Sequence, residues 1–101
     1  MSTKRADQMK AGDAFSWSHQ EDIEGVGVIT VFTVTLDRDV ELRPDQFGID
    51  RAVLYGTVSN PRVAHGSEAL EGGELAPKVA EAMAQGPGYM VLGAHLELEL
   101  V

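Results

Sequence analysis

Histidine and carboxylate side chains are the residues of this chain best suited to chemistry. The three histidines are His19, His65 and His95. His19 is two residues before Glu21, and His95 is two residues before Glu97. An imidazole beside a carboxylate is typical of a general acid or base with an orienting partner. We therefore take His95, His19 and Glu97 as the candidate catalytic residues, although an acidic surface also brings histidine and carboxylate together by chance.

These residues do not form a metal-binding pattern. The histidines lie in three separate segments without a paired spacing such as H-x-H, and the chain has no cysteine. Asp37, Asp39 and Glu41 alternate along an extended segment, where alternate side chains stand about 6–7 Å apart. Calcium prefers more closely clustered oxygens. We expect no metal, and because the nucleotide-binding and hydrolase motifs are absent, no cofactor.

The aromatic residues supply candidates for a ligand pocket. Tyr55, Tyr89 and Trp17 each combine an apolar ring with a polar tip. Placed around the mouth of a small barrel together with His95, they would form an apolar wall with a few polar groups, which is typical of a small-molecule pocket. We take the two tyrosines and the tryptophan as candidate ligand-binding residues.

The C-terminal segment, residues 88–101, has the clearest pattern. Apolar side chains occupy every second position from Met90 to Leu100, and the positions between them include His95 and Glu97. Strict alternation predicts one long strand with one buried face. A terminal strand of this kind is well suited to packing across a subunit interface. Its candidate interface residues are Leu96, Leu98 and Leu100.

The remaining elements are predicted to be three strands and one helix. Alternation and β-branched residues predict strands at 13–19, 25–36 and 51–59, the last ended by Asn60-Pro61, with a brief resumption at 62–64 as an alternative. Pro77 at the first helical position, an apolar stripe and Gly86-Pro87 predict a helix over 76–85. Residues 1–12 are expected to form a short helix or an arm, with Ala6 and Met9 inward.

This order of elements predicts a mainly β, α+β domain comprising residues 1–101. Strands with one late helix argue against a doubly wound parallel sheet. We predict a small antiparallel barrel or rolled sheet, with the short helix packed on it and a long C-terminal strand. An open α+β sheet with the helix on one face is the alternative.

Composition and charge limit the partners. The formal net charge is −8, from sixteen acidic and eight basic residues. Such a balance opposes binding to nucleic acid, where phosphate neutralisation dominates affinity. No apolar run is long enough for a membrane span, and the N-terminus lacks the apolar core of a signal peptide. We expect no nucleic acid, no membrane and a cytoplasmic location, which the lack of cysteine also fits.

Two functional hypotheses follow. The first is a non-enzymatic, self-associating assembly or protein-interaction module, including a subunit of a larger particle, because the strands offer more apolar surface than one small core hides. The second is a small barrel that binds an apolar molecule, as an isomerase, cyclase or hydrolase with a histidine or carboxylate as acid or base. An exposed His95 would count against the version of this hypothesis that uses it.

Overall fold

The computed structural model describes residues 2–71 and 74–101, which form a β-rich half-barrel with one short helix. The strands are β1 (Thr3–Arg5), β2 (Ala14–Ile23), β3 (Val26–Leu36), β4 (Glu41–Pro44), β5 (Asp50–His65), β6 (Gly88–Gly93) and β7 (Glu97–Leu100). The helix is α1 (Pro77–Gln85), and two single 3-10 turns are η1 (Ala6–Gln8) and η2 (Ser67–Ala69). The predicted fold class, mainly β with one late helix, is confirmed.

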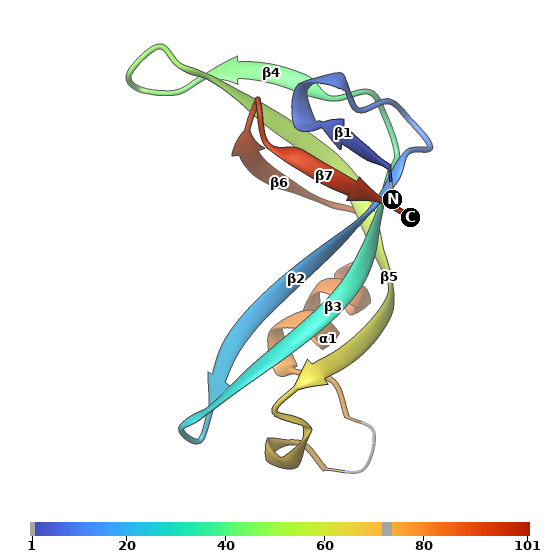
Figure 1. Ribbon diagram of the computed structural model, residues 1–101, viewed down its shortest axis with the longest axis vertical. Helices are drawn as coiled ribbons and strands as arrows, with labels where there is room; N and C mark the ends of the chain where they lie inside the picture. Colours follow the sequence, from blue (N-terminus) through green and yellow to red (C-terminus); the bar gives the residue numbers. More distant parts are fainter. Residues whose placement is uncertain (1, 72–73) are drawn as a thin grey trace.

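All strand pairs are antiparallel, and the sheet follows the order β1-β7-β2-β3-β5-β4, with β6 pairing with β5 off this path. The curved lower part of the molecule is formed by β2, β3 and β5, and α1 lies behind them (Figure 1). The upper part holds β1, β7, β6 and the projecting β4–β5 hairpin (Figure 1). The sheet curls without closing, which leaves strand edges free.

The β2–β3 hairpin is longer than predicted. The predicted strands at 13–19 and 25–36 leave residues 20–24 between them, yet β2 continues to Ile23 and pairs in register with β3 along its whole length. The turn is made by Glu24 and Gly25, both with positive φ angles (49° and 83°). Two consecutive residues of this kind match the twist of a tight hairpin. The polar residues of this segment therefore lie on an ordered strand.

The prediction that Asn60-Pro61 ends the third strand is wrong. The register of β5 on β3 shifts at this point, from Thr33 opposite Ser59 to Val31 opposite Arg62. Two residues of β5 thus face a single residue of β3, and Asn60 has a left-handed φ of 49°. Such a bulge removes local ladder bonds, so it tolerates a proline that cannot donate one. β5 is therefore bent at Asn60 and continues to His65.

The C-terminal segment is strand at both ends, but it is not one long strand. A turn at Ala94 and His95 separates β6 from β7, and Leu96 N donates to Gly93 O at 3.1 Å. β6 pairs with β5, whereas β7 pairs with β1 and β2. The alternation of buried and exposed side chains survives the turn at most positions. The periodicity therefore predicted which side chains face the core. It did not predict that the two halves of the segment pair with different strands.

Two apolar clusters form the core. The upper cluster contains Ala6, Met9, Phe15, Val34, Leu36, Ala52, Leu54 and Leu98. The lower cluster, under α1, contains Val28, Ala76 and Val79. Phe32 of β3 packs against both. The N-terminal segment, expected as a short helix or arm, forms β1 and η1, and its Ala6 and Met9 are fully buried as predicted.

The helix α1 begins and ends as the sequence indicates. Pro77 occupies an N-terminal position and the chain leaves the helix at Gly86. Only its Val79 is buried, so the helix packs on the sheet chiefly through its first half. In the described part of the chain, neither this helix nor the 3-10 turns reach the length and apolarity that crossing a bilayer requires.

Candidate functional site

An apolar hollow lies between the two core clusters, and we call it the α1 groove. Its larger part, about 350 Å³, lies between the end of α1, the start of β6 and the sheet. Its smaller part, about 90 Å³, lies beneath the start of α1. Phe32, Val58 and Ala82 line both parts. The two parts therefore adjoin each other at these three residues, under α1.

The groove exists because α1 packs closely on the sheet at Val79 but not at Ala82. Val79 is buried against the lower cluster, whereas Ala82, one turn later, is too small to fill the space above Phe32 and Val58. The wall toward the upper cluster is formed by Val34, Leu54 and Met90. A combined volume of this order is at the lower end of the range for small-molecule pockets.

One end of the α1 groove is polar. His19 lines it from β2, and the His19 Nε2 atom is buried without a hydrogen-bond partner among the described residues. This atom lies 3.7 Å from Glu21 Oε1, too far for a hydrogen bond. Thr30, directly opposite His19 on β3, is fully buried, and its Oγ1 is also without a partner. Two such atoms side by side are uncommon, because buried polar groups are nearly always satisfied.

The carboxylate of Glu21 is already engaged. Glu21 Oε1 accepts a hydrogen bond from the backbone N–H of Lys78 at 3.3 Å, in the first turn of α1. A carboxylate at this position compensates the free N–H groups and the positive end of the helix dipole. The Lys78 side chain lines the groove and forms no ion pair with the described residues. The polar end thus presents one lysine and one histidine, and no carboxylate lines the groove.

The two candidate tyrosines meet on the outer face of the sheet. Tyr55 and Tyr89 are directly opposite each other on β5 and β6, with ring centroids 6.2 Å apart. Tyr55 Oη donates to Glu41 Oε2 at 3.0 Å, and the Arg38 guanidinium lies 4.2 Å from the Tyr55 ring centroid. Hydrogen bonds from Arg43 and then Tyr55 lower the pKa of Glu41. Tyr55 is thereby fixed, while Tyr89 stays 73% exposed.

Trp17 and His95 do not join the tyrosines. Trp17 lies on the core face of β2, edge-on to Phe15 with ring centroids 6.2 Å apart. His95 occupies the turn between β6 and β7, where its side chain is 84% exposed and contacts Arg5 and Asp7. The predicted pocket of two tyrosines, a tryptophan and a histidine is therefore not assembled. The version of the enzyme hypothesis that relies on His95 loses its enclosed site.

Of the other two candidate catalytic residues, His19 lies on a different part of the sheet from His95, whereas Glu97 lies near His95, since His95 contacts the Arg5 that is paired with Glu97. Glu97 is exposed on β7, opposite Arg5 of β1, and His19 faces the α1 groove. The β6–β7 turn lies in the upper part of the molecule, whereas β2 descends into the lower part (Figure 1). In residues 2–71 and 74–101, no group of three histidines and carboxylates is arranged to hold a metal ion.

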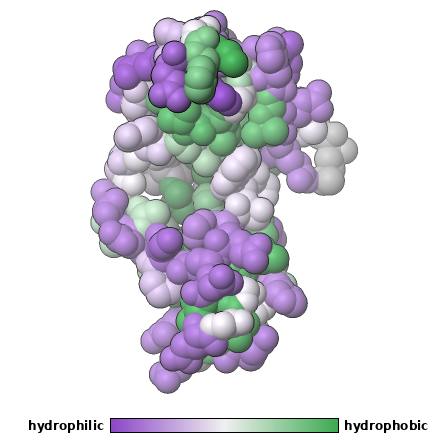
Figure 2. Space-filling view, turned by 90° about the vertical axis from the view of Figure 1, so that its left-hand side faces the viewer, coloured by the Kyte–Doolittle hydropathy of each residue, from purple (hydrophilic) through white to green (hydrophobic). Residues whose placement is uncertain are grey.

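The three candidate interface leucines differ in exposure. Leu98 is 2% exposed in the upper cluster, Leu100 is half-buried against that cluster, and Leu96 is 42% exposed. Large exposed apolar side chains instead gather on the β4–β5 hairpin and on β6, and they are Leu42, Phe47, Ile49, Tyr89 and Val91. On the face shown in Figure 2, apolar residues gather mainly in the upper half, while the lower half is mostly hydrophilic. Periodicity could not find Phe47 and Ile49, since they flank a turn.

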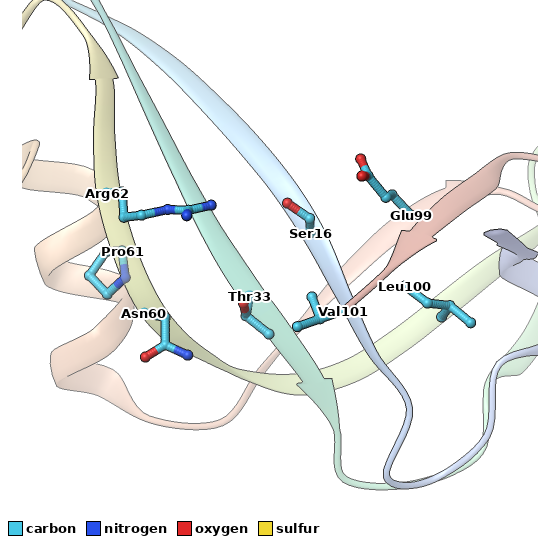
Figure 3. Close-up of a pocket in the computed structure, with 8 residues that line it drawn as sticks. All are labelled: Ser16, Thr33, Asn60, Pro61, Arg62, Glu99, Leu100 and Val101. Carbon is cyan, nitrogen blue, oxygen red and sulfur yellow. The ribbon is translucent and has the colours of Figure 1, made fainter. Parts of the chain in front are cut away.

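A polar hollow of about 610 Å³ lies on the outer face where β7 joins β2. Its polar side chains are Ser16, Thr33, Asn60, Arg62 and Glu99. The Arg62 side chain, beyond the β5 bulge, extends over β3 in the direction of β2, and the Glu99 carboxylate projects from β7 (Figure 3). Among the described residues, no ion pair or side-chain hydrogen bond joins Arg62 to Glu99, or Glu99 to Ser16, which is its partner in the β2–β7 pairing.

Strand β6 has an open edge. It pairs with β5 on one side, and no other described strand pairs with it. Its sequence, GYMVLG, contains neither a charged residue nor proline. By contrast, the end strand β4 carries Glu41, Arg43 and Pro44. Charged residues and proline are the usual protection of an exposed sheet edge. β6 lacks that protection.

Comparison of the chain with protein-family models, curated proteins and solved structures finds no significant match. The function proposed below is therefore inferred from the geometry of these sites.

Proposed function

We propose that this protein is a non-enzymatic interaction module that associates with further copies of itself through the open edge of β6. The observation that carries the proposal is the unprotected β6 edge with its exposed Tyr89 and Val91. An unpaired strand edge presents a row of free N–H and C=O groups that a second strand can satisfy.

The other exposed edge is less suitable. β4 has four residues and includes Pro44, which cannot donate a hydrogen bond to a neighbouring strand. A strand docking against β4 would also meet Glu41 and Arg43. β6 is longer, has no charge and places two large apolar side chains on its outer face. Specific pairing is therefore favoured at β6.

A pair of β6 strands from two copies would form an isologous, antiparallel contact. The same six residues would face themselves across a two-fold axis, and the two sheets would become continuous. Tyr89 and Val91 of one copy would then pack beside their counterparts. The net charge of −8 opposes such an approach, so the association should strengthen when salt screens the repulsion.

The test is the molar mass in solution. We expect size-exclusion chromatography with light scattering to show a dimer at micromolar concentration, with a larger dimeric fraction at higher salt. Val91→Lys and Tyr89→Lys place an edge-protecting charge on β6 and should each produce a monomer. Ile49→Lys is the matched control, because Ile49 is also an exposed apolar residue but lies outside β6.

Two results would contradict the proposal. A wild-type protein that stays monomeric at all salt concentrations would show that the edge of β6 does not pair. If Ile49→Lys dissociated the dimer and Val91→Lys did not, the contact between the two copies would lie on the β4–β5 hairpin.

A further inference from the structure

We infer that the α1 groove binds an amphipathic carboxylate, an apolar chain that ends in an acidic group. The acidic group would lie beside Lys78 and His19, and the chain would extend past Phe32 and Val58 toward Met90. The groove borders the self-association surface proposed above, because Tyr89 of β6 belongs to both, whereas Val91 of β6 does not line the groove.

Shape is the first argument. The two parts of the groove adjoin at Phe32, Val58 and Ala82, so a chain molecule that passes Ala82 would occupy both. Apart from Gln85, which lines the end near β6, the larger part is lined by apolar side chains, glycines and Tyr89. An elongated apolar body fits this space better than a compact polar molecule.

Charge is the second argument. Acidic residues outnumber basic residues by two to one in the chain, yet the groove lining contains Lys78 and His19 and no carboxylate. The carboxylate of Glu21, whose Oε1 lies 3.7 Å from His19 Nε2, is held by the first turn of α1. A cation without an ion-pair partner at the end of an apolar groove is complementary to an anionic head group.

The buried Nε2 of His19 is the third argument. It has no hydrogen-bond partner among the residues that the structure describes, although it lies at the polar end of the groove. A carboxylate oxygen at this point would accept a hydrogen bond from it, and would remove the cost of an unsatisfied buried group. The ligand would therefore complete the site.

Decanoate, below its micellar concentration, is the probe, and decanol is the uncharged comparison. Binding is measured by isothermal titration calorimetry and by the fluorescence of Trp17, which is the only tryptophan and stands opposite Phe32 in the β2–β3 pair. We expect saturable binding of one decanoate per chain, a change in Trp17 emission, and weaker binding of decanol.

Two variants separate the head group from the chain. Lys78→Met retains the aliphatic stem and should weaken decanoate binding about tenfold or more while leaving decanol binding unchanged. Ala82→Phe fills the point where the two parts of the groove meet and should abolish binding of both probes. Lys10→Met is the matched control, because Lys10 is an exposed lysine that does not line the groove and should have no effect. Circular dichroism confirms that each variant is folded.

Each contrary outcome is specific. Wild-type decanoate binding by folded Ala82→Phe would place the ligand elsewhere and overturn the inference. Equal losses of both probes in Lys78→Met would overturn the role of the head group. Absence of decanoate binding, with Ala82→Phe changing the molar mass, would show that a second protein copy covers the groove. The self-association proposal is tested separately, by Val91→Lys, which should bind decanoate as the wild type does.

Discussion

Tyr55 and Tyr89 face each other across the β5–β6 pair with their ring centroids 6.2 Å apart, yet only Tyr55 is held by other side chains. Glu41 accepts the hydrogen bond from Tyr55 Oη, and Arg38 covers the Tyr55 ring. Tyr89 contributes the exposed half of the pair. On the outer face of the sheet, the ring of Tyr55 is therefore fixed, whereas the ring of Tyr89, at the open edge of β6, is exposed and can contact a second molecule.

This asymmetry predicts different costs for removing the two rings. Tyr89→Ala should lower the free energy of unfolding by about 0.5–1 kcal/mol, the range of one cross-strand aromatic pair. Tyr55→Ala should cost more, because it also removes the contacts with Glu41 and Arg38. Denaturant unfolding, at a concentration where the protein is monomeric, measures both. Equal costs would contradict the assignment of the fixed ring.

Gly56 allows β5 to approach β3 closely. A Cβ atom added there would lie 2.6 Å from the Thr35 carbonyl oxygen and 3.0 Å from Val34 Cγ1. Because the nearest atom belongs to the backbone of the paired strand, Gly56→Ala should destabilise the fold by about 1–3 kcal/mol.

Gly88→Ala is the matched control, since no atom lies within 4 Å of a Cβ added at Gly88. Its change should remain within about 0.5 kcal/mol. Thermal or denaturant unfolding distinguishes the two. A neutral Gly56→Ala would mean that β5 and β3 can separate slightly at this point without loss of packing.

Leu96 and Leu98 are two residues apart and differ in burial. Leu98 is 2% exposed within the upper cluster, so Leu98→Ala should cost about 2–5 kcal/mol through the lost burial and the cavity left behind. Leu96 is 42% exposed, and Leu96→Ala should cost less than about 1 kcal/mol. Denaturant unfolding of both variants checks this. Similar costs would contradict the position of the turn at His95.

Asp13 ties the N-terminal strand to the sheet. Its Oδ2 accepts hydrogen bonds from Lys4 Nζ at 2.7 Å and from Lys10 N at 2.8 Å. The Lys4 ammonium, followed by the Lys10 amide, lowers the pKa of Asp13. A carboxyl whose pKa is lower in the folded state than in the unfolded state stabilises the fold at pH values above the unfolded-state pKa. This stabilisation is lost as the pH falls through the folded-state pKa.

Asp13→Asn should therefore reduce stability at pH 7 by less than about 1 kcal/mol, as for a partly exposed pair. The difference from the wild type should close under acid conditions, where the wild-type carboxyl is protonated. Asp37→Asn is the control, because the Asp37 carboxylate makes no hydrogen bond or ion pair with the described residues. Chemical unfolding at a series of pH values measures the difference. A gap that persists in acid would contradict the role of the charge.

Local patterns were sufficient for the class of fold and for most strand faces. Alternation placed Leu98 inward and Glu97 outward, and Pro77 with Gly86 marked the ends of α1. These signals depend on residues close in sequence, since side-chain direction repeats every two residues in a strand and every 3.6 in a helix. The bulge at Asn60 could not be predicted, because a strand that bends and a strand that ends have the same local sequence pattern.

Local patterns did not predict which side chains come together in each site. The sequence identified Tyr55, Tyr89, Trp17 and His95 as one group, but β5 and β6 bring only the two tyrosines together. The groove beneath α1 depends on how far Ala82 stands from Phe32 and Val58, residues of three separate elements. From its own residues the chain specified which side chains face inward. Strand pairing and helix packing then determined which of these side chains contact each other. Contacts between distant segments depend on strand register and topology, and sequence periodicity carries information about neither.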